Sequence, residues 1–185
     1  MPSQRNNDAI LDAARDCVLD VGLRRTTLAD VARRAGVSRM TVYRQHADLD
    51  SLVAALLTRE LTALLDQVMA ELTALPTARQ RLVEAAVQVV QRLEHHPLYR
   101  RILDLDPELL LPLVVDRFGS SQKAAMALVE ALVVEGQRDG SVREVPPATA
   151  ATVVLLTAQS FVLSARLVDE DVRRELRTLL EGYLR

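Results

Sequence analysis

The sequence has little of what builds disulfide-bonded, zinc-ribbon or β-rich proteins. Its 185 residues include one cysteine, no tryptophan and only 3% aromatic residues, with six glycines and seven prolines. The single Cys17 excludes an internal disulfide framework and a zinc ribbon, and it agrees with a reducing compartment. The opening segment lacks an apolar core flanked by basic residues, so we expect no secretory signal and a cytoplasmic protein.

Apolar residues nevertheless make up 49% of the chain, and with so few aromatics the packing falls to Ala, Leu and Val. This composition favours helices. We find no alternating strand pattern, no long internal repeat and no low-complexity tract. The sequence therefore predicts an all-α fold large enough to bury a core.

A run without charges, residues 148–165, has the minimum length of a membrane span. It contains several Thr and Ser and one Gln, and no second apolar segment accompanies it, so we expect burial between protein helices and no membrane contact. Small or aliphatic side chains recur there at helical spacing and form a stripe that allows a partner helix to approach closely. The stripe, a predicted dimer interface, consists of Ala151, Leu155, Ala158, Val162 and Ala165.

Charge is distributed unevenly although the formal net charge is only −2. Residues 1–47 carry eight Arg against five Asp, a net of +3, whereas residues 48–185 have a net of −5. Within residues 24–44, six Arg face a single acid, Asp30, and such a patch suits phosphate groups. We therefore expect a nucleic-acid-binding head, 1–47, and a larger helical body, 48–185.

Helix start and stop signals in the head predict three short helices. The first spans about residues 7–21 and stops at Gly22, and Thr27 can cap the second. Gly36 ends the second helix, and Ser38 caps a third that runs to about Gln45. Two short helices that meet at a glycine predict a helix-turn-helix, whose second helix enters the DNA major groove.

The third helix offers side chains suited to DNA. Arg reads guanine, Gln can read adenine, and Ser, Thr and Tyr suit phosphate oxygens, while Val42 turns inward. The side chains predicted to contact DNA here are Ser38, Arg39, Met40, Thr41, Tyr43, Arg44 and Gln45.

The body reads as a series of amphipathic helices. A long helix begins near Asp48 and is broken by Pro76, and Thr77 with Gln80 forms a capping box for the next. Two shorter helices are expected between Tyr99 and Phe118. The remaining predicted helices span about 120–138, the segment after Pro147, and a final stretch that includes 172–183.

The strings ILDAARDCVLDVGLRR and TTLADVARRAGVSRMTVYRQHADLDSL resemble the tetracycline-repressor-type (TetR) family of regulators. The resemblance covers about the first 55 residues: a helix ending in Gly, a Thr-capped helix, Ala-Gly-Val-Ser, and Thr-x-Tyr on the recognition helix. It implies that Thr27, Thr41 and Tyr43 contact the DNA backbone. It also implies that Arg39, Met40 and Arg44 contact base edges.

The chain departs from the family pattern in two places, at three positions, near the end of the recognition helix and just after it. The family usually has His-Phe and soon a Lys, where this chain has Gln45, His46 and Leu49. Leu49 cannot donate to phosphate, so we expect one customary contact to be absent and DNA binding to be weaker. His46 is expected to pack as an aromatic surrogate.

For the body, the resemblance implies a ligand-binding and dimerisation domain. The helix at about 120–138 and the one after Pro147 would form a four-helix bundle with a second subunit. The expected function is a repressor that binds an inverted-repeat operator as a homodimer. A small molecule would release it by shifting the long helix that begins near Asp48.

Two alternatives stay open: a ligand-independent DNA-binding or protein-interaction module, and a helical enzyme. The enzyme is disfavoured because we find no nucleophile with a base, no metal cluster and no phosphate loop, and we expect no cofactor. His95 and His96 lack further ligands at metal-binding spacing. Four side chains are weak candidates to line an effector cavity, since each is more often ordinary core or surface: Tyr99, Arg101, Phe118 and Phe161.

Overall fold

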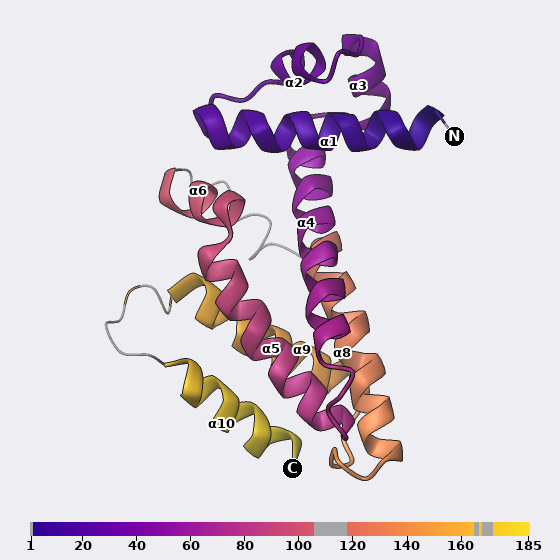
Figure 1. Cartoon of the computed structure of the whole chain (residues 1–185), viewed down its shortest axis with the longest axis vertical. Coiled ribbons are helices and arrows are strands. Elements are labelled where there is room, and N and C mark those ends of the chain that lie inside the picture. Colours follow the sequence, from indigo (N-terminus) through magenta and orange to yellow (C-terminus); the bar gives the residue numbers. More distant parts are fainter. Residues whose placement is uncertain (1, 106–117, 165–166, 168–171) are drawn as a thin grey trace. The chain divides into compact units, whose positions relative to one another are not determined.

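The computed structural model describes residues 2–105, 118–164, 167 and 172–185. Within these ranges the chain forms nine helices and no strand, which confirms the predicted all-α class. The helices are α1 (Pro2–Val21), α2 (Leu28–Arg34), α3 (Arg39–Gln45), α4 (Leu49–Glu71), α5 (Ala78–His95), α6 (Pro97–Leu105), α8 (Ser120–Arg138), α9 (Pro147–Ser164) and α10 (Arg173–Leu184) (Figure 1).

The helices group into two compact units. The first comprises Met1–Glu60 and His96–Ser121, and the second comprises Leu61–His95 and Gln122–Arg185. The long helix α4 is continuous and contributes its first half to one unit and its second half to the other. The predicted boundary at residue 47 separates a DNA-binding part from the helical body by function, whereas these units are defined by packing. It therefore stays a prediction.

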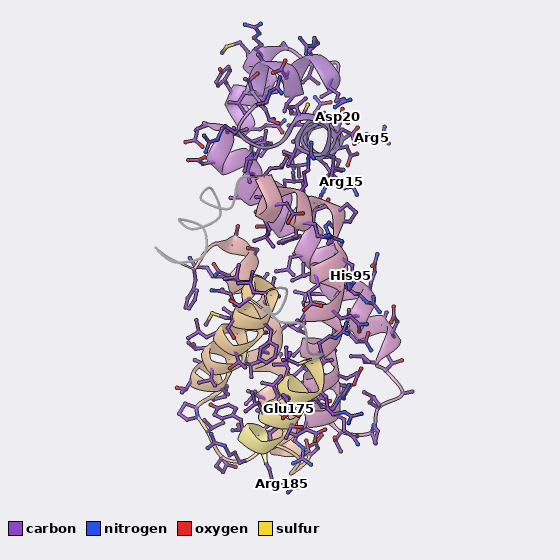
Figure 2. The ribbon with its side chains drawn as sticks, turned by 90° about the vertical axis from the view of Figure 1, so that its left-hand side faces the viewer. Arg5, Arg15, Asp20, His95, Glu175 and Arg185 are labelled. Carbon is purple, nitrogen blue, oxygen red and sulfur yellow. The ribbon has the colours of Figure 1, made fainter. Side chains whose placement is uncertain are left out.

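The first unit is built around the apolar face of α1. Figure 1 shows α2 and α3 along one side of α1, and side chains from all three helices and from α4 meet in one core. Ile10, Val31, Val42 and Leu52 are fully buried there. The 3–4 residue spacing of apolar positions on α1 leaves the rest of its surface polar. Arg15 and Asp20, labelled in Figure 2, belong to this polar surface and lie on different sides of the helix.

The core of this first unit also includes α6, which our sequence reasoning did not anticipate. Leu98 and Ile102 are fully buried against the cluster formed by α1 to α4, and Tyr99 packs against it. The rest of the stretch in which two short helices were expected lies outside the described residues. The unit that contains the helix-turn-helix therefore also includes α6, which follows α5 in the chain.

The second unit buries a separate core between α5, α8, α9 and α10. Leu82, Val133, Val154 and Leu176 are among its buried side chains, and α10 packs against both α5 and α9. The predicted cap of α5 by Thr77 is confirmed, because Thr77 Oγ1 accepts from the Gln80 amide at 3.3 Å. Gln80 Oε1 accepts from the Thr77 hydroxyl at 3.1 Å, so the two side chains of the predicted capping box meet each other. Figure 2 labels Glu175 near the start of α10 and Arg185 after its end.

Among the described helices, α9 alone has the length and composition of a membrane span. Its 18 residues have a mean hydropathy of 1.4, but one such helix is weak evidence, since a core helix meets the same criteria. Only 17% of the α9 residues are buried and most of the others are half-buried, so part of its apolar surface remains uncovered. Leu156, which is 48% exposed, belongs to that surface.

Gly136 in α8 provides a sharp test of this packing. A Cβ added at Gly136 would lie 2.3 Å from Val142 Cγ2, and Val142 is only 5% exposed, so it has little room to move. We expect Gly136→Ala to lower the free energy of unfolding by about 1–3 kcal/mol through overpacking, as measured by urea denaturation. Gly182→Ala is the matched control, because nothing lies within 4 Å of its Cβ position, and it should raise stability by up to about 1 kcal/mol. Equal effects of the two substitutions would contradict the packing described for α8.

Candidate nucleic-acid interface

Helix α2 is closed at both ends as the sequence predicts. Thr27 Oγ1 accepts a hydrogen bond from the Asp30 amide at 3.1 Å, and the Thr27 hydroxyl donates to the Asp30 carboxylate at 2.6 Å. At the other end Gly36 has φ +66°, and the Val37 amide donates to the Ala32 carbonyl at 3.1 Å. This is the hydrogen-bond pattern of a Schellman turn, which reverses the chain within two residues.

Helix α3 starts two residues after that turn. Ser38 caps it, since Ser38 Oγ accepts from the Thr41 amide at 3.1 Å and lies 2.8 Å from Thr41 Oγ1. Val42 is the one fully buried residue of this helix. A single inward anchor leaves most of the seven-residue helix facing solvent.

The exposed surface of α3 is formed by residues predicted from the sequence. Met40 is 74% exposed and Tyr43 50% exposed, and Arg39 and Arg44 are exposed as well. Thr41 is half-buried because its hydroxyl turns back toward the cap. Together these side chains form a projecting surface with two guanidinium groups, one thioether and one phenol.

Gln45 differs from its neighbours on α3. Its side-chain oxygen Oε1 is buried and has no hydrogen-bond partner among the described residues. Recognition of adenine by glutamine requires the side-chain oxygen and the amide nitrogen together. The buried oxygen therefore disfavours Gln45 as an adenine reader and leaves its amide nitrogen as the group that can donate to phosphate.

Two acidic side chains partly neutralise the positive charge of the head, and one of them lies outside the arginine-rich segment 24–44. Arg33 pairs with Asp30 at 2.8 Å, and Arg34 pairs with Asp20 of α1 at 2.6 Å. The Thr27 hydroxyl, together with Arg33, holds the pKa of Asp30 below its usual value. Asp20 was missed because it precedes the arginine-rich stretch and reaches Arg34 only through the packing of α1 on α2.

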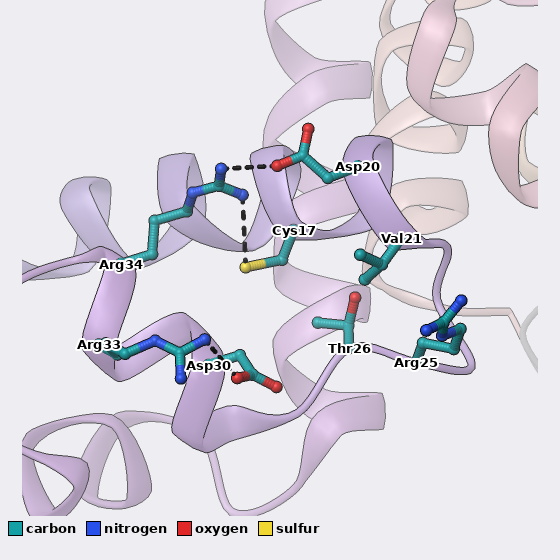
Figure 3. Close-up of a pocket in the computed structure, with 8 residues that line it drawn as sticks. All are labelled: Cys17, Asp20, Val21, Arg25, Thr26, Asp30, Arg33 and Arg34. Atoms are coloured by element: carbon teal, nitrogen blue, oxygen red, sulfur yellow. Dashed lines mark hydrogen bonds and ion pairs between the residues drawn. The ribbon is translucent and has the colours of Figure 1, made fainter.

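Figure 3 shows these ion pairs around a hollow of about 500 Å³ between α1 and α2. Arg34 also lies 3.8 Å from the Cys17 sulfur, and Arg25 stands at the rim. Because acids and bases both line the hollow, it does not form an anion site by charge alone. Arg25, Arg39 and Arg44 have no ion pair with any described residue, so these cations are available to a polyanion.

His46 and Leu49, two of the three positions that depart from the usual pattern, pack inward. His46 is 7% exposed, and its Nε2 lies 3.1 Å from Asn7 Oδ1, so the predicted packing is observed. Burial lowers the pKa of His46, which keeps the ring neutral near pH 7. Leu49 is half-buried against the core of the first unit, where a lysine would have reached outward.

The four candidate ligand contacts are not brought together as one group. The Tyr99 hydroxyl donates to the Leu57 carbonyl at 3.2 Å, and Arg101 Nη2 donates to the Asp20 carbonyl at 3.2 Å, so both attach α6 to the first unit. Burial raises the pKa of the Tyr99 phenol. Phe118 is half-buried in the same unit, whereas Phe161 packs against the core of the second. Within the described part of the chain, no three potential metal ligands gather.

The described residues of the predicted dimer stripe on α9 lie mostly against the core of their own unit. Ala151 is fully buried, and Ala158 and Val162 pack partly against the core of their own unit. Leu155 is half-buried, and Ala165 lies outside the described residues. The apolar surface that α9 leaves uncovered is therefore centred on Leu156 more than on the alanines.

Comparison with known proteins agrees with this geometry. Residues 10–56 match the family model of bacterial regulatory proteins, tetR family. An HTH-type transcriptional regulator of Mycobacterium bovis is 39% identical over 180 residues, which cover 95% of this chain and 92% of that protein.

Two solved structures share the fold. The R. erythropolis transcriptional repressor QsdR, from the TetR family, has a TM-score of 0.76 at 17% identity and covers 98% of this chain and 97% of its own. The transcriptional regulator FadR from Bacillus subtilis, in complex with stearoyl-CoA, has a TM-score of 0.67 at 16% identity and covers 96% and 98%.

Ser38 allows capping and DNA contact to be tested separately. Ser38→Ala removes the cap of α3 and should destabilise the protein by about 1 kcal/mol in thermal or urea unfolding. Ser38→Asp retains a capping oxygen, so stability should be kept, but its charge should weaken binding to duplex DNA by repelling phosphate. Unchanged DNA affinity in Ser38→Asp would place Ser38 away from the DNA.

Proposed function

Because the chain belongs to the tetR family of bacterial regulatory proteins, and is thus a DNA-binding transcription regulator, we propose that it represses transcription by binding an inverted-repeat operator as a homodimer. The observation that carries this proposal is the exposed surface of α3, which stands on a single buried anchor, Val42. Recognition helices of one dimer would enter successive major grooves about 34 Å apart.

The side chains of α3 divide by chemistry into two roles. Arg39 and Arg44 carry guanidinium groups that pair with guanine edges, and the exposed Met40 offers apolar contact to a thymine methyl group. Backbone phosphates would be held by hydroxyl and amide donors, which do not read sequence. This second set consists of Thr27, Ser38, Thr41, Tyr43 and Gln45.

Dimerisation is proposed to use α8 and α9. Support comes from the uncovered apolar surface of α9, which would cost free energy if left in water. Exposed Ala127 and Ala131 on α8 are small enough for close helix approach. Ala151, being fully buried in the chain, is not included in the proposed contact surface.

The effector is proposed to be a small molecule that binds within residues 48–185 in the cytoplasm. The similar FadR structure holds stearoyl-CoA, which supports a ligand role for the corresponding part of this fold. Phe118 and Phe161 remain the candidates for lining its site, because Tyr99 and Arg101 are already engaged in holding α6. Family membership favours this function over a ligand-independent module and over a helical enzyme.

Selection of bound genomic DNA fragments by the purified protein is the experiment that tests the proposal. We expect the recovered fragments to share an inverted repeat, whose half-site spacing follows from two heads on one dimer. Fragments without a shared repeat would argue against a sequence-specific operator. The enriched site then serves as the probe for the variants below.

Arg44→Ala should weaken binding to this operator by about 5- to 150-fold, because a lost bidentate guanine contact costs about 1–3 kcal/mol. Adding Tyr43→Ala should abolish the gel shift. Arg174→Ala is the control, since Arg174 is exposed on α10 and lies outside the proposed interface. Fluorescence anisotropy at two salt concentrations measures the loss, and wild-type affinity in the double variant would refute the assigned contacts.

Leu156→Glu should convert the dimer to a monomer at micromolar concentration, because a carboxylate at a helix–helix contact stays unpaired when buried. Analytical ultracentrifugation measures the change. Leu179→Glu on α10 is the matched control: Leu179 is 55% exposed, close to the 48% of Leu156, but is not in the proposed interface. A dimer that survives Leu156→Glu would move the interface elsewhere.

A further inference from the structure

A cluster of charged side chains joins three helices of the first unit around Glu60. Glu60 is on α4 and only 14% of its side chain is exposed. Its Oε2 lies 3.4 Å from Arg15 Nε on α1, and its Oε1 lies 3.1 Å from Arg59. Arg59 in turn binds Asp12 of α1 at 2.8 Å. Two ion pairs thus hold the first helix of the DNA-binding head against the middle of α4.

His96 brings α6 into this cluster. It immediately precedes α6, and its Nε2 lies 3.5 Å from Glu60 Oε2, with 18% of the His96 side chain exposed. The imidazole packs edge-on against Tyr99, with ring centroids 5.4 Å apart and an interplanar angle of 83°. The Tyr99 hydroxyl is hydrogen-bonded to the Leu57 carbonyl on α4, and this bond holds the Tyr99 ring beside His96.

The surroundings of His96 favour its neutral form. Its other ring nitrogen, Nδ1, is buried and has no hydrogen-bond partner among the described residues. With Nε2 carrying the proton toward Glu60, protonation of the ring would create an N–H group at Nδ1 with no acceptor, and such a buried donor is costly. The groups that face the ring are Glu60 from α4, Arg15 from α1 and Tyr99 from α6.

Electrostatic effects also favour the neutral form of His96. Burial lowers the pKa of His96; Glu60 opposes this effect, and the Arg15 guanidinium adds to it. A histidine freed from this site has a pKa of about 6.5, so it accepts a proton more readily than His96 does here. The observed arrangement is therefore fully stable above about pH 6.5 and loses stability as the pH falls below that value.

We propose that His96 is a positioning residue that makes operator binding sensitive to acid. Protonation of the buried His96 ring disfavours the packing of α6 at this site. Displacement of α6 then weakens the ion pair between Glu60 and Arg15 of α1. The helix-turn-helix packs on α1, and a less firmly held head presents α3 to the operator less often. This inference rests on the operator binding proposed above, and it adds a group that touches neither DNA nor effector.

The test compares the affinity of the full-length protein for its operator at about pH 7.5 and about pH 5.5, at constant ionic strength. Wild-type binding should weaken in acid, by at most about tenfold for each unit that separates the two pKa values of His96. In His96→Gln the ratio of the two affinities should approach one, whatever the absolute affinity. Glu60→Gln removes the charge that raises the pKa of His96, so it should increase the ratio, and it provides a second variant if His96→Gln does not fold.

The chain has only three histidines, so the contribution of each to the pH response can be measured by substitution. His95→Gln is the matched control, because His95 is exposed and should retain the wild-type ratio. His46→Gln measures the separate contribution of the buried histidine in the head. The inference is overturned if wild type shows no acid response, or if His96→Gln keeps it in full. Absence of operator binding at about pH 7.5 would instead refute the proposed function itself, and the inference with it.

Discussion

The left-handed conformation of Gly36 is the constraint on which the DNA-binding surface depends. A side chain at φ +66° is strained, but glycine adopts this conformation freely, and the chain reverses there within two residues. The hydrogen bond from Val37 to Ala32 then aligns Ser38 to cap α3. With Val42 as its only fully buried residue, α3 cannot hold its own orientation, so the turn and the cap determine which side chains project.

Charge in the head is organised by pairing as much as by composition. Asp30 and Asp20 occupy Arg33 and Arg34, so the available positive charge lies on α3 and at Arg25, before α2, rather than on α2 itself. Surface pairs of this kind are weak, and a phosphate can compete for them. The head can therefore make specific contacts through α3 and adaptable phosphate contacts through Arg33 and Arg34.

Helix α6 belongs to the same unit as the helix-turn-helix, and this bears on regulation. Helix α6 follows α5 in the chain, yet Leu98 and Ile102 belong to the core of the unit that holds the helix-turn-helix. Glu60 connects α4 to α1 through Arg15 and receives His96 at the start of α6. Any event that moves α6 must therefore disturb contacts of the head, and this gives a ligand-driven change in operator affinity a physical route.

The sequence by itself determined the helices, their caps and the face of α3, because capping residues, glycines and 3.6-residue periodicity act within a few residues of each other. Only the tertiary structure decided the partners of those faces: Asp20 with Arg34, α6 with the head, Ala151 with its own core, and the buried oxygen of Gln45. These contacts join positions far apart in the chain or depend on how elements pack. Local spacing carries no information about them, because burial and ion pairing are properties of the packed chain.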